Sequence, residues 1–257
     1  MKITVVGVGS MGGAIVKGLI NSGVDEVSGL NPTNPRVSKL ADQLGFQLFT
    51  TASEVIEYRP DVVILTTPAN ITVAVAKELD GLPGSTVIIS AAAGVRQHDL
   101  QEALPNNTIA TMIPNTPVAV NAGTIGLALP ALDSKDNSAN ITHVLNQLGD
   151  VILVTEDKLD IVGVVGGCGP AFVDVFMDAM SDAAVKHGLD RRTAYELIAS
   201  MVKGTGALAY DTGKSPAALR DEVTSPAGTT IKGVEALEKH GFRFGVIDAV
   251  NKANGEN

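Results

Sequence analysis

The sequence predicts an α/β fold: a doubly wound sheet followed by an all-helical part. Three observations predict it. A β-branched run, Lys2–Gly7, ends in glycine and is followed by helical periodicity. Nearly unbroken apolar runs at 61–67 and 85–92 alternate with helical segments, as in a parallel sheet covered on both faces. Strand patterns then stop after Thr155. We therefore expect a Rossmann-type domain over residues 1–155 and a helical dimerisation domain over 156–257.

Length and composition limit the possible functions. At 257 residues, two domains are expected. A net charge of −9 argues against nucleic acid or an anionic membrane surface as partner. Residues 1–20 are apolar but are interrupted by glycines, so they predict neither a signal peptide nor a membrane span. The single cysteine, Cys168, excludes an internal disulfide and fits a cytoplasmic location.

The turn after the first strand has the pattern of a dinucleotide site. It contains Gly7-x-Gly9-x-x-Gly12 and leads into a helix over 10–20. Such glycines permit a tight turn, close approach of a pyrophosphate and close helix packing. We expect the cofactor to contact this turn and helix start, namely Gly7, Gly9, Ser10, Met11 and Gly12. The alternative is a glycine turn with a structural role only.

The second strand, 26–30, predicts which nicotinamide cofactor is used. It ends at Asn31, where an acidic residue would hold the ribose diol of NAD. Asn31, Thr33, Asn34 and Arg36 can instead donate to a 2′-phosphate. We therefore expect NADPH, with NADH as the alternative. Arg36 on its own is equally well explained as a solvated helix charge.

Further cofactor contacts are expected where the parallel strands end, because ligands bind outside their carboxyl ends. These residues are Thr66, Thr67, Pro68, Ala91, Ala92 and Ala93. Asn115, in the turn after the strand 109–113, is a candidate to bind a nicotinamide carboxamide or the substrate. A plain Asn-containing turn explains it equally well.

The second half predicts helices over 157–165, 170–187 and 191–210 and a shorter one from Ser215-Pro216. They are rich in small residues and poor in aromatic ones. Helices of this kind suggest that two chains intertwine, so we expect a homodimer or higher oligomer. A monomeric bundle is the alternative.

The loop 223–230 is the second candidate anion site. We expect Ser225 to cap the following helix with Pro226 at its first position, or Thr229 to be the cap. A helix start of this kind offers free N–H groups and hydroxyls to a small anion such as a carboxylate. An ordinary capped surface helix is the alternative.

No metal or nucleophile site is predicted. Cys168 has no histidine or acid nearby in the sequence. The four histidines, His98, His143, His187 and His240, are scattered without metal-ligand spacing.

These motifs resemble, in order and over the whole chain, the pyrroline-5-carboxylate reductase family. The stretch 7–12 is similar to the family's nucleotide turn, 90–94 to its strand-end segment, and 114–117 to its Pro-Asn-Thr-Pro turn. The stretch 167–172 resembles Gly-Ser-Gly-Pro-Ala-Tyr. The most specific match is the family signature at Asp221–Gly233.

The resemblance implies reduction of 1-pyrroline-5-carboxylate to L-proline by NAD(P)H. It implies that the backbone of the signature loop holds the substrate carboxylate, at Gly228, Thr229 and Thr230, and that Thr230 acts near the ring nitrogen. Ser225 and Glu222 are further residues of this segment that we expect to contact the substrate. Three positions differ from the family pattern. Thr67 replaces a lysine, Thr111 replaces an arginine, and Ala227 replaces a glycine where a positive φ would cause strain.

A cyclic imine suits a site without a placed proton donor, because it can bind already protonated. Catalysis then consists mostly of positioning the imine carbon about 3–3.5 Å from the nicotinamide. Two other classes stay open. One is a β-hydroxyacid-type reductase, and the other is a non-catalytic regulatory relative similar to the late-competence proteins.

Overall fold

The computed structural model describes residues 1–130 and 135–255. These form two compact units, Met1–Gly167 and Cys168–Asn257, each described here by itself. The division lies after the expected boundary at 155/156, because the intervening segment packs on strands of the first unit. Leu159 is buried there, and Val162 lies against Gly126, which has no room for a side chain.

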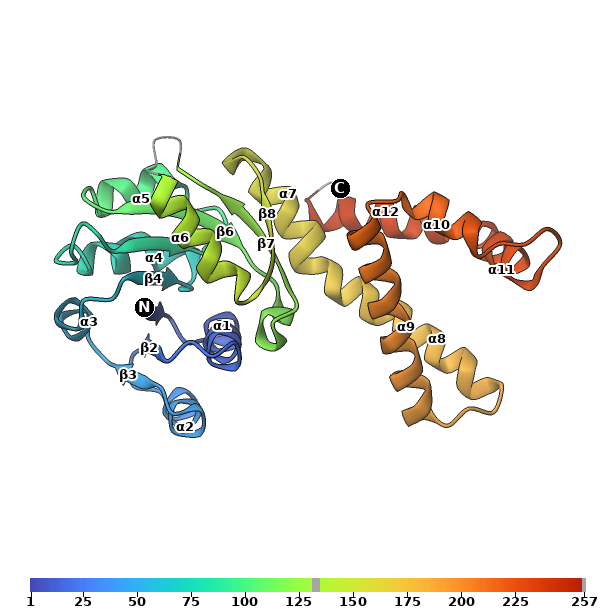
Figure 1. Ribbon diagram of the computed structural model, residues 1–257, viewed down its shortest axis with the longest axis horizontal. Helices are drawn as coiled ribbons and strands as arrows, with labels where there is room; N and C mark the ends of the chain where they lie inside the picture. Colours follow the sequence, from blue (N-terminus) through green and yellow to red (C-terminus); the bar gives the residue numbers. More distant parts are fainter. Residues whose placement is uncertain (131–134, 256–257) are drawn as a thin grey trace. The chain divides into compact units, whose positions relative to one another are not determined.

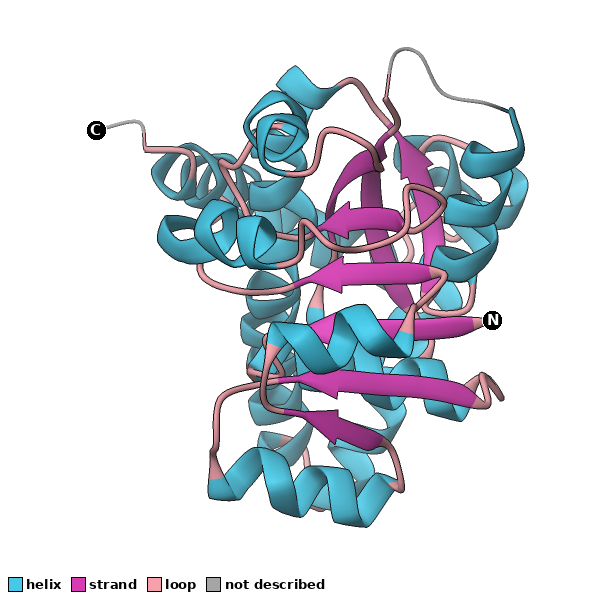
Figure 2. Cartoon of the chain, turned by 90° about the vertical axis from the view of Figure 1, so that its left-hand side faces the viewer, coloured by secondary structure: helices cyan, strands magenta, loops and turns pink. Residues whose placement is uncertain are grey.

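The first unit is a sheet with helices on both faces (Figure 2). Its eight strands lie in the order β3-β2-β1-β4-β5-β6-β7-β8. The strands are β1 (Lys2–Val6), β2 (Glu26–Leu30), β3 (Gln47–Phe49), β4 (Val62–Leu65), β5 (Val87–Ser90), β6 (Thr108–Ile113), β7 (Gly123–Ala128) and β8 (Gly149–Leu153). The helices are α1 (Ser10–Asn21), α2 (Pro35–Leu44), α3 (Ala52–Tyr58), α4 (Ala69–Glu78), α5 (Gln97–Ala103), α6 (Lys135–Asn146) and α7 (Leu159–Val162), with 3₁₀ turns at Thr116–Val120 and Glu156–Lys158.

The two faces of the sheet bury separate apolar clusters, because successive strand residues point to opposite sides. In β4, Ile64 packs with α1, α2 and α6, whereas its neighbours Val63 and Leu65 pack with α3, α4 and α5. Strands buried on both sides explain the unbroken apolar runs in the sequence. The chain leaves β1 toward β2 at one edge of the sheet and leaves β4 toward β5 at the other edge. The strand order therefore reverses between β1 and β4. Ligands bind at this point in such sheets.

The sheet is mixed: the parallel arrangement expected from the first strands does not extend to the pair β6 and β7. β6 and β7 pair antiparallel, while β7 and β8 are again parallel. The connection 114–122 contains only a 3₁₀ turn. It is too short for the helical crossover that a parallel pair needs, so the chain reverses direction.

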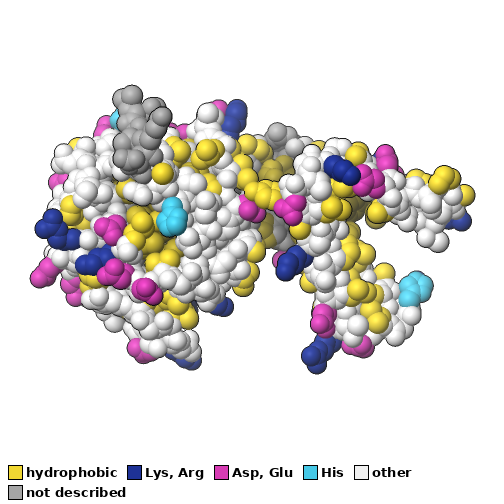
Figure 3. Space-filling model, in the orientation of Figure 1, with side chains coloured by type: hydrophobic (Ala, Val, Ile, Leu, Met, Phe, Trp, Pro, Cys, Tyr) yellow, Lys and Arg dark blue, Asp and Glu magenta, His cyan; other side chains and the backbone are white. Residues whose placement is uncertain are grey.

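The second unit consists of helices: α8 (Gly169–Lys186), α9 (Arg191–Thr212), α10 (Pro216–Glu222), α11 (Thr229–Lys239) and α12 (Phe242–Ala253). A π-helical segment, Gly163–Cys168, spans the division between the two units in the sequence. Among the described residues of the second unit, 168–255, few side chains are buried; they are Ser181, Ala194 and Ile198. Figure 3 shows hydrophobic side chains exposed along these helices. Within this one chain, the second unit therefore lacks a large core of its own.

Some helix boundaries differ from the expected ones. Although Ser53 is the residue that the sequence favours as the cap of α3, the cap is Thr51, and α2 starts at Pro35, capped by Asn34, rather than at Val37. The sequence analysis did not predict α4, α5 or α12. The first residues of α4 and α12 follow Pro68 and Gly241, which have no capping side chain, so the usual start signal is missing.

Candidate functional site

The glycine turn after β1 has the shape that a dinucleotide requires. Gly7 has φ +92°, a conformation that favours glycine. A Cβ at Gly12 would lie 2.3 Å from the carbonyl oxygen of Gly7, so only glycine lets α1 approach the strand. A Cβ at Gly9 would meet nothing within 4 Å. The backbone at Gly9 is thus open to a ligand, as a pyrophosphate needs.

The start of α1 has the features of an anion site. Its cap residue, Gly9, provides no side-chain cap, and the first turn contains no acidic residue. The N–H groups of Ser10, Met11 and Gly12 therefore point out of the helix end with the positive end of its dipole. These are the residues expected to bind the cofactor.

Thr66 fixes this turn to the neighbouring strand. Its hydroxyl lies 3.0 Å from the carbonyl oxygen of Val6 and 2.8 Å from that of Gly7, and it donates to these oxygens. The contribution of Thr66 visible in the structure is therefore to hold the turn. Direct contact of Thr66 with a cofactor stays a prediction.

A cavity of about 550 Å³ opens beside the turn. Val6, Gly7 and Leu30 form its inner end, Thr50–Ser53 one wall, and residues of α4 another. Ile71 and Val75 of α4 give this wall an apolar surface, which sequence reasoning missed because it did not predict the helix. Thr67 also lines the cavity, and its hydroxyl lies 2.9 Å from that of the buried Thr72.

The wall at Thr50–Ser53 is held by Glu54. The backbone N–H of Thr50 and the hydroxyl and N–H of Thr51 donate to this carboxylate and hold the pKa of Glu54 below its ordinary value. Thr51 in turn caps α3. This capping box fixes the polar wall of the cavity.

Asn31 and Asn34 mainly shape the loop after β2. The side-chain amide of Asn31 donates to the carbonyl oxygen of Pro32 at 2.8 Å. Asn34 accepts the N–H of Arg36 at 3.0 Å and so starts α2. The Arg36 side chain lines a separate hollow.

The loop after β5 is open to solvent at Ala93 and Gly94. Ala91 is partly buried, Ala92 is buried and Ala93 is exposed, and Gly94 follows with φ +80°.

Asn115 lies in the first unit and is 6% exposed. Its amide donates to the carbonyl oxygen of Gly166 at 3.0 Å and accepts the N–H of Thr124 at 2.9 Å. The structure thus uses both ends of this amide to join segments of the unit.

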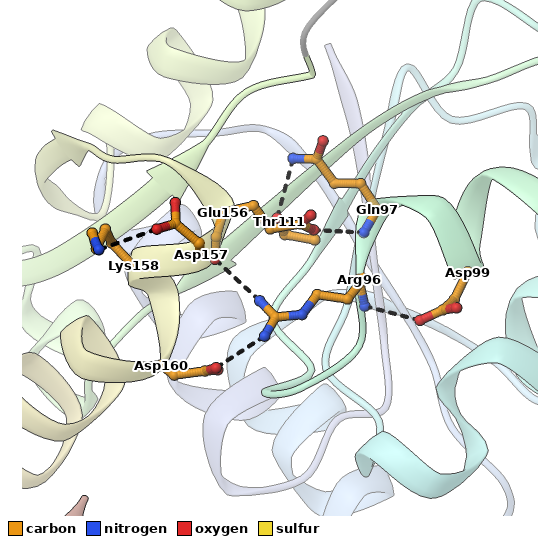
Figure 4. A network of polar contacts seen from close by, with 8 residues as sticks. All are labelled: Arg96, Gln97, Asp99, Thr111, Glu156, Asp157, Lys158 and Asp160. Atoms are coloured by element: carbon orange, nitrogen blue, oxygen red, sulfur yellow. Dashed lines mark hydrogen bonds and ion pairs between the residues drawn. The ribbon is translucent and has the colours of Figure 1, made fainter.

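Arg96 and Gln97, just beyond this loop, connect it to the segment after β8 (Figure 4). The guanidinium donates to the carbonyl oxygen of Glu156 and pairs with Asp160 at 2.9 Å. The Glu156 carboxylate accepts the N–H of Gln97 at 2.6 Å.

Thr111 occupies the position where the family pattern has an arginine. It is 3% exposed and accepts the side-chain amide of Gln97 at 3.2 Å. The structure therefore accommodates this departure within the polar network, with no unpaired buried group at Thr111.

In the second unit, α11 begins differently from either expectation. Its cap is Gly228, with no capping side chain, so neither Ser225 nor Thr229 is the cap. The reason is a tight turn that precedes the helix, closed by the N–H of Gly228 and the carbonyl oxygen of Ser225 at 3.0 Å. Ala227 is the third of the four residues of this turn and has φ +59°. A positive φ at this position is typical of type II turns, in which proline is common at the second position, as Pro226 is here.

The start of α11 also has the features of an anion site. Thr229 and Thr230 are exposed at its first two positions, and no acidic residue lies in its first turn. Glu222, at the end of α10, pairs with Lys214 at 2.6 Å. The negative charge of Glu222, which precedes this helix start in the sequence, is thus balanced by Lys214. This ion pair reduces the repulsion that Glu222 would exert on an anion at the helix start.

Among residues 1–130 and 135–255, no group of three His, Cys, Asp or Glu side chains is placed to hold a metal ion. Cys168 is exposed.

Comparisons with known proteins agree with this architecture. A family model for pyrroline-5-carboxylate reductase dimerisation matches residues 156–257, and one for coenzyme F420-dependent NADP oxidoreductases matches residues 2–94. The chain is 36% identical to the pyrroline-5-carboxylate reductase of Escherichia coli, over 98% of this chain and 95% of that protein. It is 34% identical to that of Treponema pallidum, over 98% of both chains.

Solved structures give the same result. A pyrroline-5-carboxylate reductase from Coxiella burnetii superposes with a TM-score of 0.85 at 30% identity, covering 99% of this chain and 96% of that one. The Plasmodium falciparum enzyme, solved with NADP bound, gives a TM-score of 0.84 at 25% identity, covering 100% and 96%. With similarity along almost the whole length, a glycine turn built for a dinucleotide and a matching helical unit, this chain belongs to the pyrroline-5-carboxylate reductase family.

Proposed function

We propose that this protein reduces 1-pyrroline-5-carboxylate to L-proline with NADPH, the last step of proline biosynthesis. The observation that carries the proposal is the full-length similarity to reductases of this name. A relative in this family binds NADP, and the N-terminal part matches a family of NADP oxidoreductases. NADH is the second candidate reductant.

The residues of the first unit fit a nicotinamide dinucleotide. The open backbone at Gly9 and the N–H groups of Ser10 to Gly12, which have no intrahelical acceptor, suit the pyrophosphate. The strand-end residues Thr66 to Pro68 and Ala91 to Ala93, together with Asn31 and Asn115, are the further contacts that we assign to the cofactor. The reduced nicotinamide supplies the hydride.

The residues of the second unit fit the substrate. The N–H groups at Gly228 to Thr230 bind the carboxylate, assisted by the Ser225 hydroxyl, while Glu222 supports this segment through Lys214. The Thr230 hydroxyl hydrogen-bonds the ring nitrogen and holds the imine carbon in line for the hydride.

The proton balance requires no acid from the protein. The imine binds as an iminium ion, so the hydride converts C=N to C–H and N–H without a further proton. The chain's own contribution is orientation and electrostatic stabilisation of the bound carboxylate.

We further propose that the chain acts as a homodimer or larger oligomer in the cytoplasm. By length and composition alone, the stretch Glu156–Lys186, with mean hydropathy 1.6, is apolar enough to cross a membrane. However, residues 156–257 match a dimerisation domain, and the exposed apolar faces suit a second copy of the chain. We therefore assign these faces to subunit contacts.

The test is to follow NADPH oxidation by the purified protein with 1-pyrroline-5-carboxylate, and then with β-hydroxyacid precursors such as 3-oxo acids. We expect turnover of the imine and formation of proline, measured by amino-acid analysis. Turnover of the oxo acids alone would identify a β-hydroxyacid-type reductase. Binding of NADPH without turnover of any substrate would identify a regulatory relative.

A further inference from the structure

The loop 91–96, between β5 and α5, is held at its two ends and open in between. At its start, the N–H of Ala91 donates to the carbonyl oxygen of Leu65 in β4 at 2.8 Å. In its middle, Ala93 and Gly94 are exposed. At its end, the chain enters α5. The position of the exposed residues therefore depends on how firmly the two ends are fixed.

The second end is attached to the turn Glu156–Lys158, which joins β8 to α7 (Figure 1). The Glu156 carboxylate accepts the N–H of Gln97, the first residue of α5, at 2.6 Å. The Arg96 guanidinium donates to the carbonyl oxygen of Glu156 at 3.1 Å and pairs with Asp160 at 2.9 Å. The loop is thus fixed by a segment that lies 59 and 60 positions further along the chain.

The Gln97 side chain extends this attachment into the sheet (Figure 4). Its amide nitrogen donates to the hydroxyl of Thr111 in β6 at 3.2 Å and to the carbonyl oxygen of Ala128 in β7 at 2.8 Å. The hydroxyl of Thr111 in turn donates to the same oxygen of Glu156 that accepts the Gln97 N–H, at 3.5 Å. We call Arg96, Gln97, Thr111 and Glu156 together the Glu156 network.

The strongest link in the Glu156 network runs from the carboxylate to Gln97. It is short, charge-assisted and partly buried, and such hydrogen bonds are about twice as strong as neutral ones. The side chains of Arg96 and Asp160 are 41% and 60% exposed, so solvent screens their ion pair and it contributes little. We therefore expect Glu156 and Gln97 to hold the end of the loop, with Arg96 in support.

The loop lies on the side of the sheet where a dinucleotide places its nicotinamide. In this type of fold the two halves of the dinucleotide lie on opposite sides of the point where the strand order reverses, with the pyrophosphate at the turn after the first strand. Here that point lies between β1 and β4. β2 and β3 lie on the adenosine side, and β4 and β5 on the nicotinamide side. The exposed residues after β5 therefore lie on the nicotinamide side.

We propose that the Glu156 network positions the loop 91–96 against the reduced nicotinamide, and that Glu156 and Gln97 thereby set the distance over which the hydride moves. The inference rests on the proposed function, in which this loop contacts the cofactor. The side chains of Glu156 and Gln97 bond to other parts of the first unit, so both are positioning residues. The buried Thr111, where the family pattern has an arginine, takes part in the same positioning.

The test follows the nicotinamide directly, through the fluorescence lifetime of bound NADPH. The chain has no tryptophan, so energy transfer from that side chain does not disturb the signal. Glu156→Ala and Gln97→Ala should shorten the lifetime, because a loosely held nicotinamide loses its excitation faster through motion and contact with solvent. NADPH affinity, measured by calorimetry, should change by less than about threefold, since the turn that we assign to the pyrophosphate is untouched.

Turnover of the imine gives a second measurement. For Glu156→Ala and Gln97→Ala we expect kcat to fall about tenfold, because hydride transfer is sensitive to small displacements of the reacting atoms. Glu156→Gln keeps an acceptor oxygen for the N–H of Gln97 on a side chain of the same size. It should therefore restore most of the lifetime and most of the turnover.

The matched control is Asp157→Ala, which removes a carboxylate from the same turn. Asp157 is exposed, and its partners, Thr155 and Lys158, lie in its own segment. This variant should leave the lifetime, the NADPH affinity and kcat unchanged. Equal effects of Asp157→Ala and Glu156→Ala would overturn the proposal.

Thermal unfolding of each variant separates positioning from a purely structural role. If Glu156→Ala and Gln97→Ala unfold at a lower temperature but keep the native lifetime and kcat, the network only stabilises the fold and the proposal is wrong. Failure of the proposed function is a different result, in which the native protein binds NADPH but does not reduce the imine. The fluorescence lifetimes then still decide whether the network holds the nicotinamide.

Discussion

Thr230 is exposed at the second position of α11, at a helix start that has no capping side chain. Its hydroxyl is thus available to a ligand and does not serve to start the helix. Thr67 and Thr111, in contrast, have hydrogen-bond partners inside the first unit. The structure separates residues with similar side chains into those that face solvent and those that support the fold.

Replacing Thr230 with alanine should lower kcat about tenfold to a hundredfold, because a hydrogen bond to a charged ring nitrogen is lost. NADPH affinity, measured by calorimetry, should be unchanged. Thr230→Ser keeps the hydroxyl and should restore most of the turnover. Equal losses of turnover and NADPH affinity in Thr230→Ala would refute the assigned role.

Ala227 is the departure from the family signature with a visible physical cost. A φ of +59° costs an L-residue about 1–2 kcal/mol, which replacement by glycine removes. Glycine is also more flexible in the unfolded chain, which lowers the stability of the variant by about 0.4–1 kcal/mol. Ala227→Gly should therefore raise the free energy of unfolding by up to about 1 kcal/mol. Thermal unfolding at fixed protein concentration measures this change.

The matched control for this change is Ala218→Gly inside α10, where glycine should cost about 1 kcal/mol. If both variants lose stability equally, the conformation of Ala227 contributes no strain.

At the scale of the element, the turn between β1 and α1 separates two roles of glycine. A Cβ at Gly9 meets nothing within 4 Å, so the fold leaves room for an alanine side chain there. A Cβ at Gly12 would lie 2.3 Å from a backbone oxygen, so the helix must shift. One glycine leaves space for a ligand, and the other permits packing.

Gly9→Ala should keep thermal stability within about 0.5 kcal/mol while lowering NADP⁺ affinity at least tenfold. Gly12→Ala should lose about 1–3 kcal/mol of stability in addition to affinity. Calorimetry with NADP⁺ and thermal unfolding without it distinguish the two. The reverse pattern, in which Gly9→Ala binds normally, would contradict a dinucleotide site at this turn.

Element prediction succeeded where local signals are strong. The strand-turn-helix at residues 2–21 and the cap of α10 by Ser215 follow from glycine positions and capping residues alone. It failed for α4, which follows a proline without a capping side chain. It also misplaced the start of α11, because the turn at 225–228 uses residues that resemble a helix cap.

At the scale of the whole molecule, the second unit has exposed apolar side chains that one chain leaves uncovered. Along α9, Ala194 and Ile198 are buried, whereas Leu197, Met201 and Leu208 are 59%, 38% and 51% exposed. Their spacing of four and seven residues places the exposed set on one helix face. We expect this face to contact a second copy of the chain.

Leu208→Asp should dissociate the oligomer, because it places a charge in an apolar interface and removes about 1.5–3 kcal/mol of burial per copy. Light scattering after gel filtration measures the mass. Val120→Asp, at a side chain 65% exposed in the first unit, is the control and should leave the mass unchanged. A native protein that elutes as a monomer would contradict the expectation.

The sequence by itself determined the fold class, the dinucleotide turn and the family, because glycine spacing, strand hydrophobicity and a specific signature are local properties. The tertiary structure decided which residues face each other. It placed Lys17 of α1 at the same hollow as Arg36 and Lys39 of α2, although the two helices are apart in the sequence. It also gave Ala227 its positive φ and reversed β7 against β6, since these depend on how the chain packs and turns in space.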